Sequence, residues 1–193
     1  SFDTSTVTNM GNMFMSCTAL NSPITFNTSA VTIMTNMFNT CWAFNQTVNF
    51  DTSNVTAMDS MFFDCRSFNN GGQQLSFNTS KVVNFGSMLL RGSTAGGFIP
   101  YNFPFNCSIA SVASGTAASL STKFGNVFGT AMSTTNYTTS LDNIVAQAPN
   151  IPSYINFGYV NKRLSTSATQ ILQVRNNSTS YNILVNTYKW TIN

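Results

Sequence analysis

The stretch FDTSTVTNMGNMFMSC at residues 2–17 returns as FNTSAVTIMTNMFNTC at residues 26–41, as FDTSNVTAMDSMFFDC at 50–65 and as FNTSKVVNFGSMLLRG at 77–92. The unit repeats after 24, 24 and 27 residues, and the inserted segment NNGGQQ accounts for the longer third step. A fixed period of this length is the mark of repeat architectures, in which each unit packs mainly against its neighbours.

The four units carry apolar residues at the same positions, so the apolar side chains form columns. We expect these columns to be the core of the repeats: Val7, Met10, Met13, Phe14, Val31, Met34, Met37, Phe38, Val55, Met58, Met61, Phe62, Val82 and Met88. Cys17, Cys41 and Cys65 form one more column, and Gly92 takes the position in the fourth unit.

Within a unit the apolar spacing changes from one period to another. Between Val7 and Cys17 the spacing fits one face of a short helix, and Ile24 and Phe26 alternate as in a short strand. Neither element can bury its apolar face alone, whereas stacking the units creates one continuous core. The pattern therefore predicts an α/β repeat fold, a leucine-rich-repeat-like right-handed solenoid of short strands and short helices.

The rest of the chain divides into two parts. We expect residues 1–92 to form four repeats, residues 93–132 a divergent fifth repeat or linker, and residues 133–193 a small α+β cap. In the cap, the spacing in TTNYTTSLDNIVAQAP predicts a helix that Pro149 ends. The segments YINFGYV and QILQV predict strands, and SYNILVNTYKWTI predicts a short helix followed by a strand.

The composition favours an extracellular protein. Only 7% of the residues are charged, where about 25% is usual. The polar surface must therefore consist of Asn, Thr and Ser. The net charge of +3 forms no basic patch, so we expect no nucleic-acid partner. No apolar run approaches the roughly 18 residues of a membrane span. A chain that begins at Ser1 is expected to be a processed mature protein or a piece of a longer one.

The repeats FDTSxVTxMxxMFxxC over residues 1–92 resemble those of the BspA-type surface proteins, a leucine-rich-repeat-like family. MSTTNYTTSLDNI and the closing YKWTIN are similar to the C-terminal segment of that family, whereas residues 93–123 depart from its pattern. The resemblance implies a surface-exposed, often adhesive protein of a bacterium, a protist or a large virus. It implies no catalytic site.

The residues themselves also argue against catalysis and metal binding. The chain has no His and no Glu. Asp59 and Asp64 are five residues apart within one repeat, and we expect both to be solvent-exposed polar residues and not an acid/base pair. We therefore expect no enzyme, no cofactor and no metal. A column of Asp3, Asn27, Asp51 and Asn78 could suggest calcium, but Asx turns explain it better. The neighbouring threonine columns fit backbone hydrogen bonds at turns better than ice binding.

The cysteines and the asparagines of the repeats could each take part in covalent chemistry. In-register thiols at Cys17, Cys41 and Cys65 would lie at disulfide distance, but side chains that point the same way favour free buried thiols. N-glycosylation sequons begin at Asn27, Asn45, Asn54, Asn78, Asn106, Asn136, Asn176 and Asn177. In a secretory context several of these would carry glycans.

Two functions of different class remain. In the first, the exposed end of the stacked repeats binds the far end of another copy, and head-to-tail contacts that do not close give an extracellular fibre or surface layer. In the second, the chain is an adhesin or recognition module on a cell or virion surface, and one face of the repeats binds a ligand. The sequence favours the first, a self-associating structural protein.

Overall fold

The computed structural model of this 193-residue chain describes residues 2–92, 99–108, 133–147, 156–158, 178–187 and 191–192. The regular elements among them are a 3-10 helix η1 (Asn70–Gly72), helices α2 (Thr134–Val145) and α4 (Thr179–Asn186), and strands β1 (Asn156–Gly158) and β2 (Thr191–Ile192). Most of the described chain before α2 lies outside helices and strands and is held together by turns and bridges.

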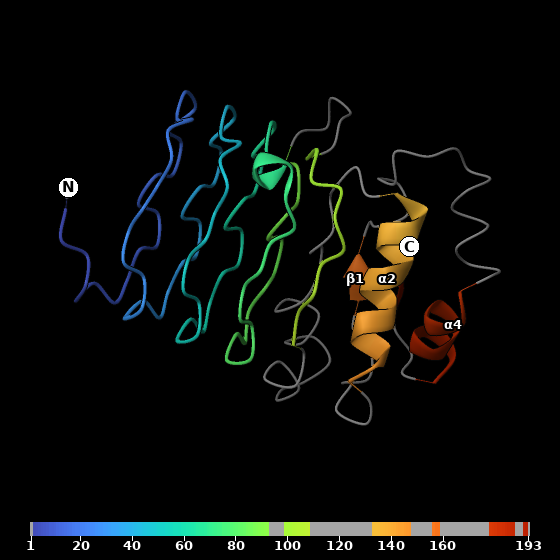
Figure 1. Cartoon of the computed structure of the whole chain (residues 1–193). Helices are drawn as coiled ribbons and strands as arrows, with labels where there is room; N and C mark the ends of the chain where they lie inside the picture. The colour runs from blue at the N-terminus through green and yellow to red at the C-terminus, as the bar shows by residue number, and fades with distance from the viewer. Residues whose placement is uncertain are drawn as a thin grey trace.

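The repeats form successive coils that lie side by side along one axis (Figure 1). Parallel bridges join equivalent positions of neighbouring coils: Asn9 with Ile33, Ile33 with Ala57, and Ala57 with Asn84. Each repeat of the sequence is thus one coil. We name them coil 1 (residues 2–25), coil 2 (26–49), coil 3 (50–76) and coil 4 (77–104).

The short helix predicted within each unit does not form in coils 1 to 3, and the described part of coil 4 has none either. The backbone instead makes consecutive turns, such as Met13 N–H to Met10 C=O (3.3 Å) and Cys17 N–H to Phe14 C=O (3.0 Å). Residues in the left-handed region interrupt any helix, among them Asn12 (φ 60°) and Ser16 (φ 64°). The predicted short strands are likewise reduced to isolated bridges in these residues.

Backbone hydrogen bonds join the coils in a directed ladder. Alternate N–H groups of coil 1 donate to coil 2: Met10 to Ile33 O (2.9 Å), Asn12 to Thr35 O (3.0 Å), Phe14 to Met37 O (2.9 Å) and Ser16 to Asn39 O (2.8 Å). Coil 2 donates to coil 3, and coil 3 to coil 4, through the same four positions. The polar backbone of the turns is therefore satisfied between coils, as a buried backbone requires.

Side chains add further ladders between coils. Thr4, Thr28 and Thr52 are buried, and each hydroxyl donates to a carbonyl of the next coil at 3.0 Å. Asn45 N–H donates to Asn21 Oδ1 (2.9 Å), and Asn69 N–H donates to Asn45 Oδ1 (2.7 Å). Few charges are needed in such a fold because neutral amides and hydroxyls hold the coils in register.

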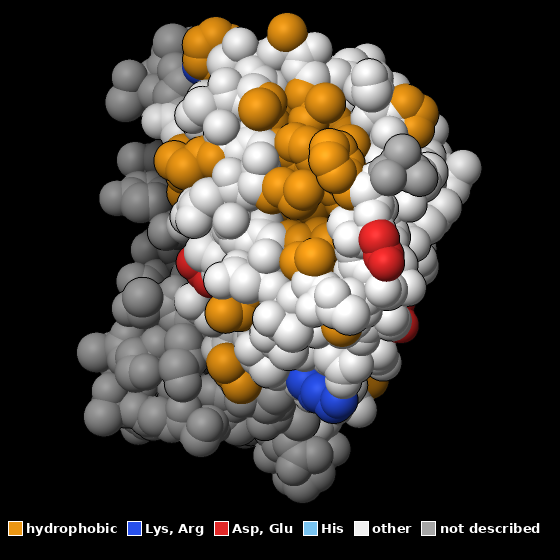
Figure 2. Space-filling model, turned by 90° about the vertical axis from the view of Figure 1, so that its left-hand side faces the viewer, with side chains coloured by type: hydrophobic (Ala, Val, Ile, Leu, Met, Phe, Trp, Pro, Cys, Tyr) orange, Lys and Arg blue, Asp and Glu red, His pale blue; other side chains and the backbone are white. Residues whose placement is uncertain are grey.

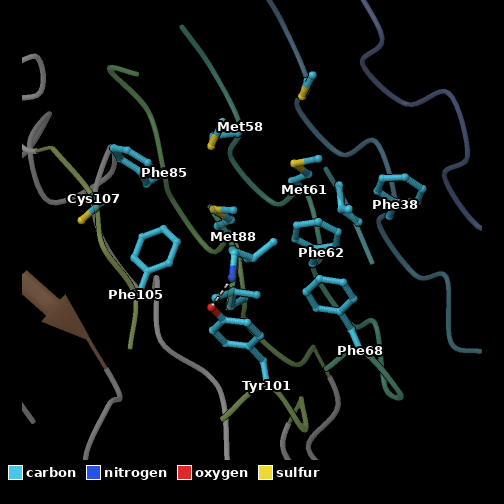
Figure 3. Close-up of a cluster of buried hydrophobic side chains, with 14 of the residues drawn as sticks. Phe38, Met58, Met61, Phe62, Phe68, Phe85, Met88, Tyr101, Phe105 and Cys107 are labelled. Atoms are coloured by element: carbon cyan, nitrogen blue, oxygen red, sulfur yellow. Dashed lines mark hydrogen bonds between the residues drawn. The ribbon is translucent and has the colours of Figure 1, made fainter. Parts of the chain in front are cut away.

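The core is a row of stacked aromatic rings and methionines between the coils (Figure 3). The rings of Phe38 and Phe62 lie 5.6 Å apart at an interplanar angle of 1°, and those of Phe62 and Phe68 lie 4.0 Å apart. Met58, Met61 and Met88 fill the space beside them and are fully buried. This burial supplies the main driving force for stacking the coils.

The stack continues past residue 92, where the sequence predicted a divergent segment. Tyr101 stacks on Phe68 at 6.1 Å, and its hydroxyl accepts a hydrogen bond from Leu75 N–H (3.0 Å). Asn102 N–H donates to Asn69 Oδ1 (3.3 Å), which extends the asparagine ladder. Residues 99–104 thus close coil 4. Ser108 N–H donates to Thr79 Oγ1 (2.7 Å), so residues 105–108 lie against coil 4 as the start of one more turn.

Helix α2 lies across the C-terminal end of the described coils (Figure 1). Ser133 caps it by accepting Asn136 N–H at 3.2 Å, and Tyr137, Leu141 and Ile144 are buried in the core. Phe105 N–H donates to Ser140 Oγ (2.9 Å) and joins the helix to the last coil.

The remaining elements gather beside α2. Helix α4, capped by Ser178, contacts α2 through the hydrogen bond from Ser180 Oγ to Asp142 Oδ1 (2.6 Å). Strands β1 and β2 pair in parallel. Helix α2 and strands β1 and β2 fall within segments predicted to form such elements, and α4 begins one residue before its predicted segment. The predicted strand QILQV lies outside the described residues.

Candidate functional site

The N-terminal end of the stack exposes an apolar surface. Figure 2 faces this end and shows hydrophobic side chains gathered at its centre. Phe2 is 83% exposed, Met13 44% and Met15 47%, whereas most apolar side chains of the inner coils are buried. We call the outward side of coil 1 the open face. It holds three of the five large hydrophobic side chains that are exposed in the described residues, whereas apolar surface is usually covered.

The open face corrects part of the predicted core. Met37 and Met61 share a column with Met13 and are fully buried, whereas Met13 is exposed. Val7 and Phe14 are only half-buried. The reason is geometric, because each of these columns is covered by the preceding coil and no described residues precede coil 1. The other members of the predicted core are buried: Met10, Val31, Met34, Met37, Phe38, Val55, Met58, Met61, Phe62, Val82 and Met88.

The backbone of the open face has a defined polarity. In coil 2, the carbonyls of Ile33, Thr35, Met37 and Asn39 accept hydrogen bonds from coil 1. The equivalent carbonyls of coil 1 belong to Asn9, Gly11, Met13 and Met15, and they accept none from the described part of the chain. The open face therefore carries a row of four acceptors at alternate residues, next to the exposed methionines.

The cysteine column follows the same asymmetry. All four cysteines are free, with Cys17 exposed and Cys41, Cys65 and Cys107 buried. Cys41 Sγ donates to Phe14 O (2.9 Å), and Cys65 Sγ donates to Phe38 O (2.8 Å). Burial raises the pKa of Cys41 to about 11 and that of Cys107 to about 12, and it also raises the pKa of Cys65. Each buried thiol is thus held protonated, and Cys17 is the accessible one.

The side of the stack carries a cluster of charged and aromatic residues. The Arg66 guanidinium lies 4.1 Å from the centre of the Trp42 ring and donates to Asp64 Oδ2 at 3.0 Å. Trp42 Nε1 donates to the same oxygen at 3.2 Å, and Arg91 Nε lies 3.9 Å from Asp64 Oδ1. Neighbouring coils place Trp42 beside Arg66 and Asp64 beside Arg91. Single columns read down the sequence did not predict this cluster.

The sequons differ in accessibility. Asn27, Asn54, Asn78 and Asn106 are exposed. Asn45 and Asn136 are half-buried, and their amides hold structural hydrogen bonds to Asn69 N–H and to Asn102 O respectively. Asn176 and Asn177 lie outside the described residues.

The column of Asp3, Asn27, Asp51 and Asn78 forms Asx turns. Asp3 Oδ1 accepts Ser5 N–H (2.9 Å), and Asp51 Oδ1 accepts Ser53 N–H (2.9 Å). These hydrogen bonds lower the pKa of both carboxylates. Asn27 makes the equivalent turn with Ser29, and Asn78 with Ser80. In the described residues, no three His, Cys, Asp or Glu side chains gather where they could hold a metal ion.

None of the helices in the described segments has both the length and the apolar character needed to cross a bilayer.

Repeated coils with one exposed end define a repeat protein. Residues 1–97, just over half of the chain, match the family model described as "Mycoplasma protein of unknown function, DUF285", and the chain belongs to this family. No curated protein and no solved structure matches the chain.

Proposed function

We propose that this protein is a non-enzymatic, extracellular structural protein: a leucine-rich-repeat-like right-handed solenoid whose copies join head to tail into a fibre or surface layer. The observation that carries this proposal is the open face. The same column is fully buried at Met37 and Met61 and 44% exposed at Met13, so one more layer of protein on coil 1 would complete the pattern.

The composition supports a fibre rather than a freely diffusing domain. With only 7% charged residues, copies that pack closely meet little charge repulsion. In the described coils, neutral asparagine and threonine ladders join neighbouring coils, and the ion pair between coils is that of Arg91 with Asp64. An extracellular setting, the resemblance to BspA-type surface repeats and glycosylation at the exposed sequons fit this proposal and form part of it.

Negative-stain electron microscopy of the purified protein tests the proposal. We expect regular filaments or sheets in the native protein and discrete particles in the Met13→Asp variant, because a carboxylate on the open face would have to be buried without a partner. Val83→Asp is the matched control, since Val83 is also an exposed apolar residue (37%) but belongs to coil 4. Discrete small particles of the native protein at all concentrations would refute the fibre.

A second function, surface recognition, is favoured by the Trp42 cluster. Trp42 is 40% exposed and Arg66 is fixed over it by Asp64, and rigid Trp and Arg side chains are typical anchors of binding surfaces. Glycan-array binding would test this alternative. Signal that is lost in Trp42→Ala and kept in Met13→Asp would support an adhesin.

A further inference from the structure

We propose that the groove between the last coil and helix α2 is a binding site for an uncharged oligosaccharide. The site lies at the C-terminal end of the coils and uses no residue of the open face. It goes beyond the proposed function, because a fibre and a dispersed protein would carry it equally.

Two hollows adjoin in this groove. The larger one, with a volume of about 510 Å³, is bounded by residues 77–80 of coil 4, by residues 106–108 and by the C-terminal end of α2. The smaller one, of about 330 Å³, continues along residues 74–77. Phe77 and Asn106 line both, so the hollows are neighbours along one groove. Each volume falls within the roughly 300–1,000 Å³ that ligand sites occupy, and such sites often lie where two structural units meet.

Hydrogen bonds hold the walls of the larger hollow together. Ser108 N–H donates to Thr79 Oγ1 (2.7 Å), which joins residues 106–108 to coil 4. Gln147 Nε2 donates to Cys107 O (2.7 Å), which joins the end of α2 to the same segment. A site whose walls are already fixed does not lose the entropy of ordering them when a ligand binds.

The groove is polar but carries no charge. None of the described residues that line its two hollows is Asp, Glu, Lys or Arg. A charged ligand, such as a phosphate ester, would lose water there without gaining an opposite charge. A wholly apolar ligand would cover amides and hydroxyls and leave them without partners. The lining therefore favours a ligand that is uncharged and rich in hydrogen-bonding groups.

Three asparagine side chains offer hydrogen bonds to such a ligand. The side-chain amides of Asn106 and Asn143 have no hydrogen-bond partner among the described residues. Asn78 uses its Oδ1 in the turn with Ser80 N–H (3.1 Å), which leaves its amide N–H groups for a ligand. A side-chain amide has one acceptor oxygen and two donor hydrogens, so it can bond two neighbouring sugar hydroxyls at once.

Phe77 adds an apolar surface to these amides. It packs against the core and is half-buried, and it lines both hollows. An aromatic ring at this place can pack on the C–H face of a sugar ring while the amides bond its hydroxyls. This combination favours a carbohydrate over a neutral peptide, whose hydrogen-bonding groups are mostly in its backbone.

Equilibrium dialysis of the native protein against tritium-labelled probes tests the groove. The probes are neutral tetrasaccharides of glucose, of mannose and of N-acetylglucosamine. Tetragalacturonate and a tetrapeptide of Ser, Gly and Asn with blocked ends are the comparison probes. Because Asn78 and Asn106 begin sequons, the protein is made in a host without N-glycosylation, which keeps both amides free. We expect at least one neutral tetrasaccharide to bind, and neither comparison probe.

Substitutions in the groove should weaken this binding. Asn106→Ala removes one amide and should weaken it about tenfold. Phe77→Leu keeps an apolar side chain against the core but removes the ring, and its effect should be similar. Asn182→Ala is the matched control, because this exposed asparagine of α4 lines neither hollow, and binding should not change. Trp42→Ala should also bind as the native protein does. Continued protection of Cys65 from alkylation shows that each variant is folded.

Three results would overturn the proposal. The first is that no neutral tetrasaccharide binds to the native protein. The second is binding that is lost in Trp42→Ala and kept in Asn106→Ala, which would place the sugar on the Trp42 cluster. The third is preferential binding of tetragalacturonate or of the tetrapeptide, which would contradict the class of ligand. The fibre is judged separately, because dialysis measures filaments and dispersed copies alike.

Discussion

The apolar core is covered to different extents at the two ends of the stack, although the same kind of coil forms both. At the C-terminal end, helix α2 lays Tyr137, Leu141 and Ile144 over the core, and all three are buried. At the N-terminal end, Met13 and Phe2 stand exposed beside a row of carbonyls without partners in the described residues. A coil is therefore complete only when both of its faces are covered. The burial under α2 stabilises the fold, and the exposed apolar side chains at the N-terminal end are the basis of the proposed function.

The largest expected effect on stability comes from replacing one phenylalanine column at a buried position and at a half-buried position. Phe62→Ala removes a ring stacked on Phe38 and Phe68, and we expect it to lower the free energy of unfolding by about 3–5 kcal/mol. Phe14→Ala removes the equivalent half-buried ring at the open face and should cost about 1 kcal/mol in dilute protein. Urea unfolding followed by circular dichroism measures both. Equal losses would mean that the open face is covered within a single copy.

The next effect compares the two ends directly. Leu141→Ala leaves a cavity between α2 and the last coil, with an expected loss of about 2–4 kcal/mol. Met13→Ala removes a side chain that is already 44% exposed, and its loss should stay below about 1 kcal/mol. The same unfolding measurement in dilute protein compares them. A larger loss for Met13→Ala would contradict the assignment of the open end.

The buried thiols give a dependence on pH. Their pKa values are raised in the folded protein, from 9.0 to about 11 for Cys41 and to about 12 for Cys107. The unfolded chain therefore releases these protons at lower pH than the folded chain. The stability that protonated thiols contribute is complete below pH 9.0 and is lost as the pH rises toward about 11. Unfolding measured across this range should show the decline, and Cys41→Ala should make it less steep; an unchanged slope would rule out Cys41 as a source.

The smallest effect is that of salt on assembly. Because only 7% of the residues are charged and the exposed side chains of the open face include Phe2, Met13 and Met15, added salt should change the rate of filament growth little. Light scattering followed over time at several NaCl concentrations measures the rate. Growth that slows steeply with salt would contradict an apolar contact and indicate attraction between charged groups.

The sequence predicted which positions are core and where the last helices lie, but it could not predict the shape of the backbone within a unit. Apolar spacing between Val7 and Cys17 fits a helix and also fits consecutive turns that bring the same side chains inward. The distinguishing signal was the small polar residue at two fixed positions, such as Asn12 and Ser16, since short polar side chains tolerate the left-handed region better than most.

Two other features needed the structure. The pair Tyr101–Asn102 continues the Phe68–Asn69 column after 33 residues instead of 24, and the nine extra residues hide the repeat. The row of acceptors on the open face follows from the turns of the backbone, which no side-chain pattern specifies.

The most direct test of the central claim is the alkylation rate of Cys17 measured by mass spectrometry as the protein concentration rises. Cys17 is the exposed thiol of coil 1, and the three buried thiols serve as internal references. The head-to-tail account predicts that Cys17 reacts readily in dilute protein and becomes protected as copies assemble, while Met13→Asp leaves it reactive at every concentration. A Cys17 rate that is independent of concentration would show that no second copy covers the open face.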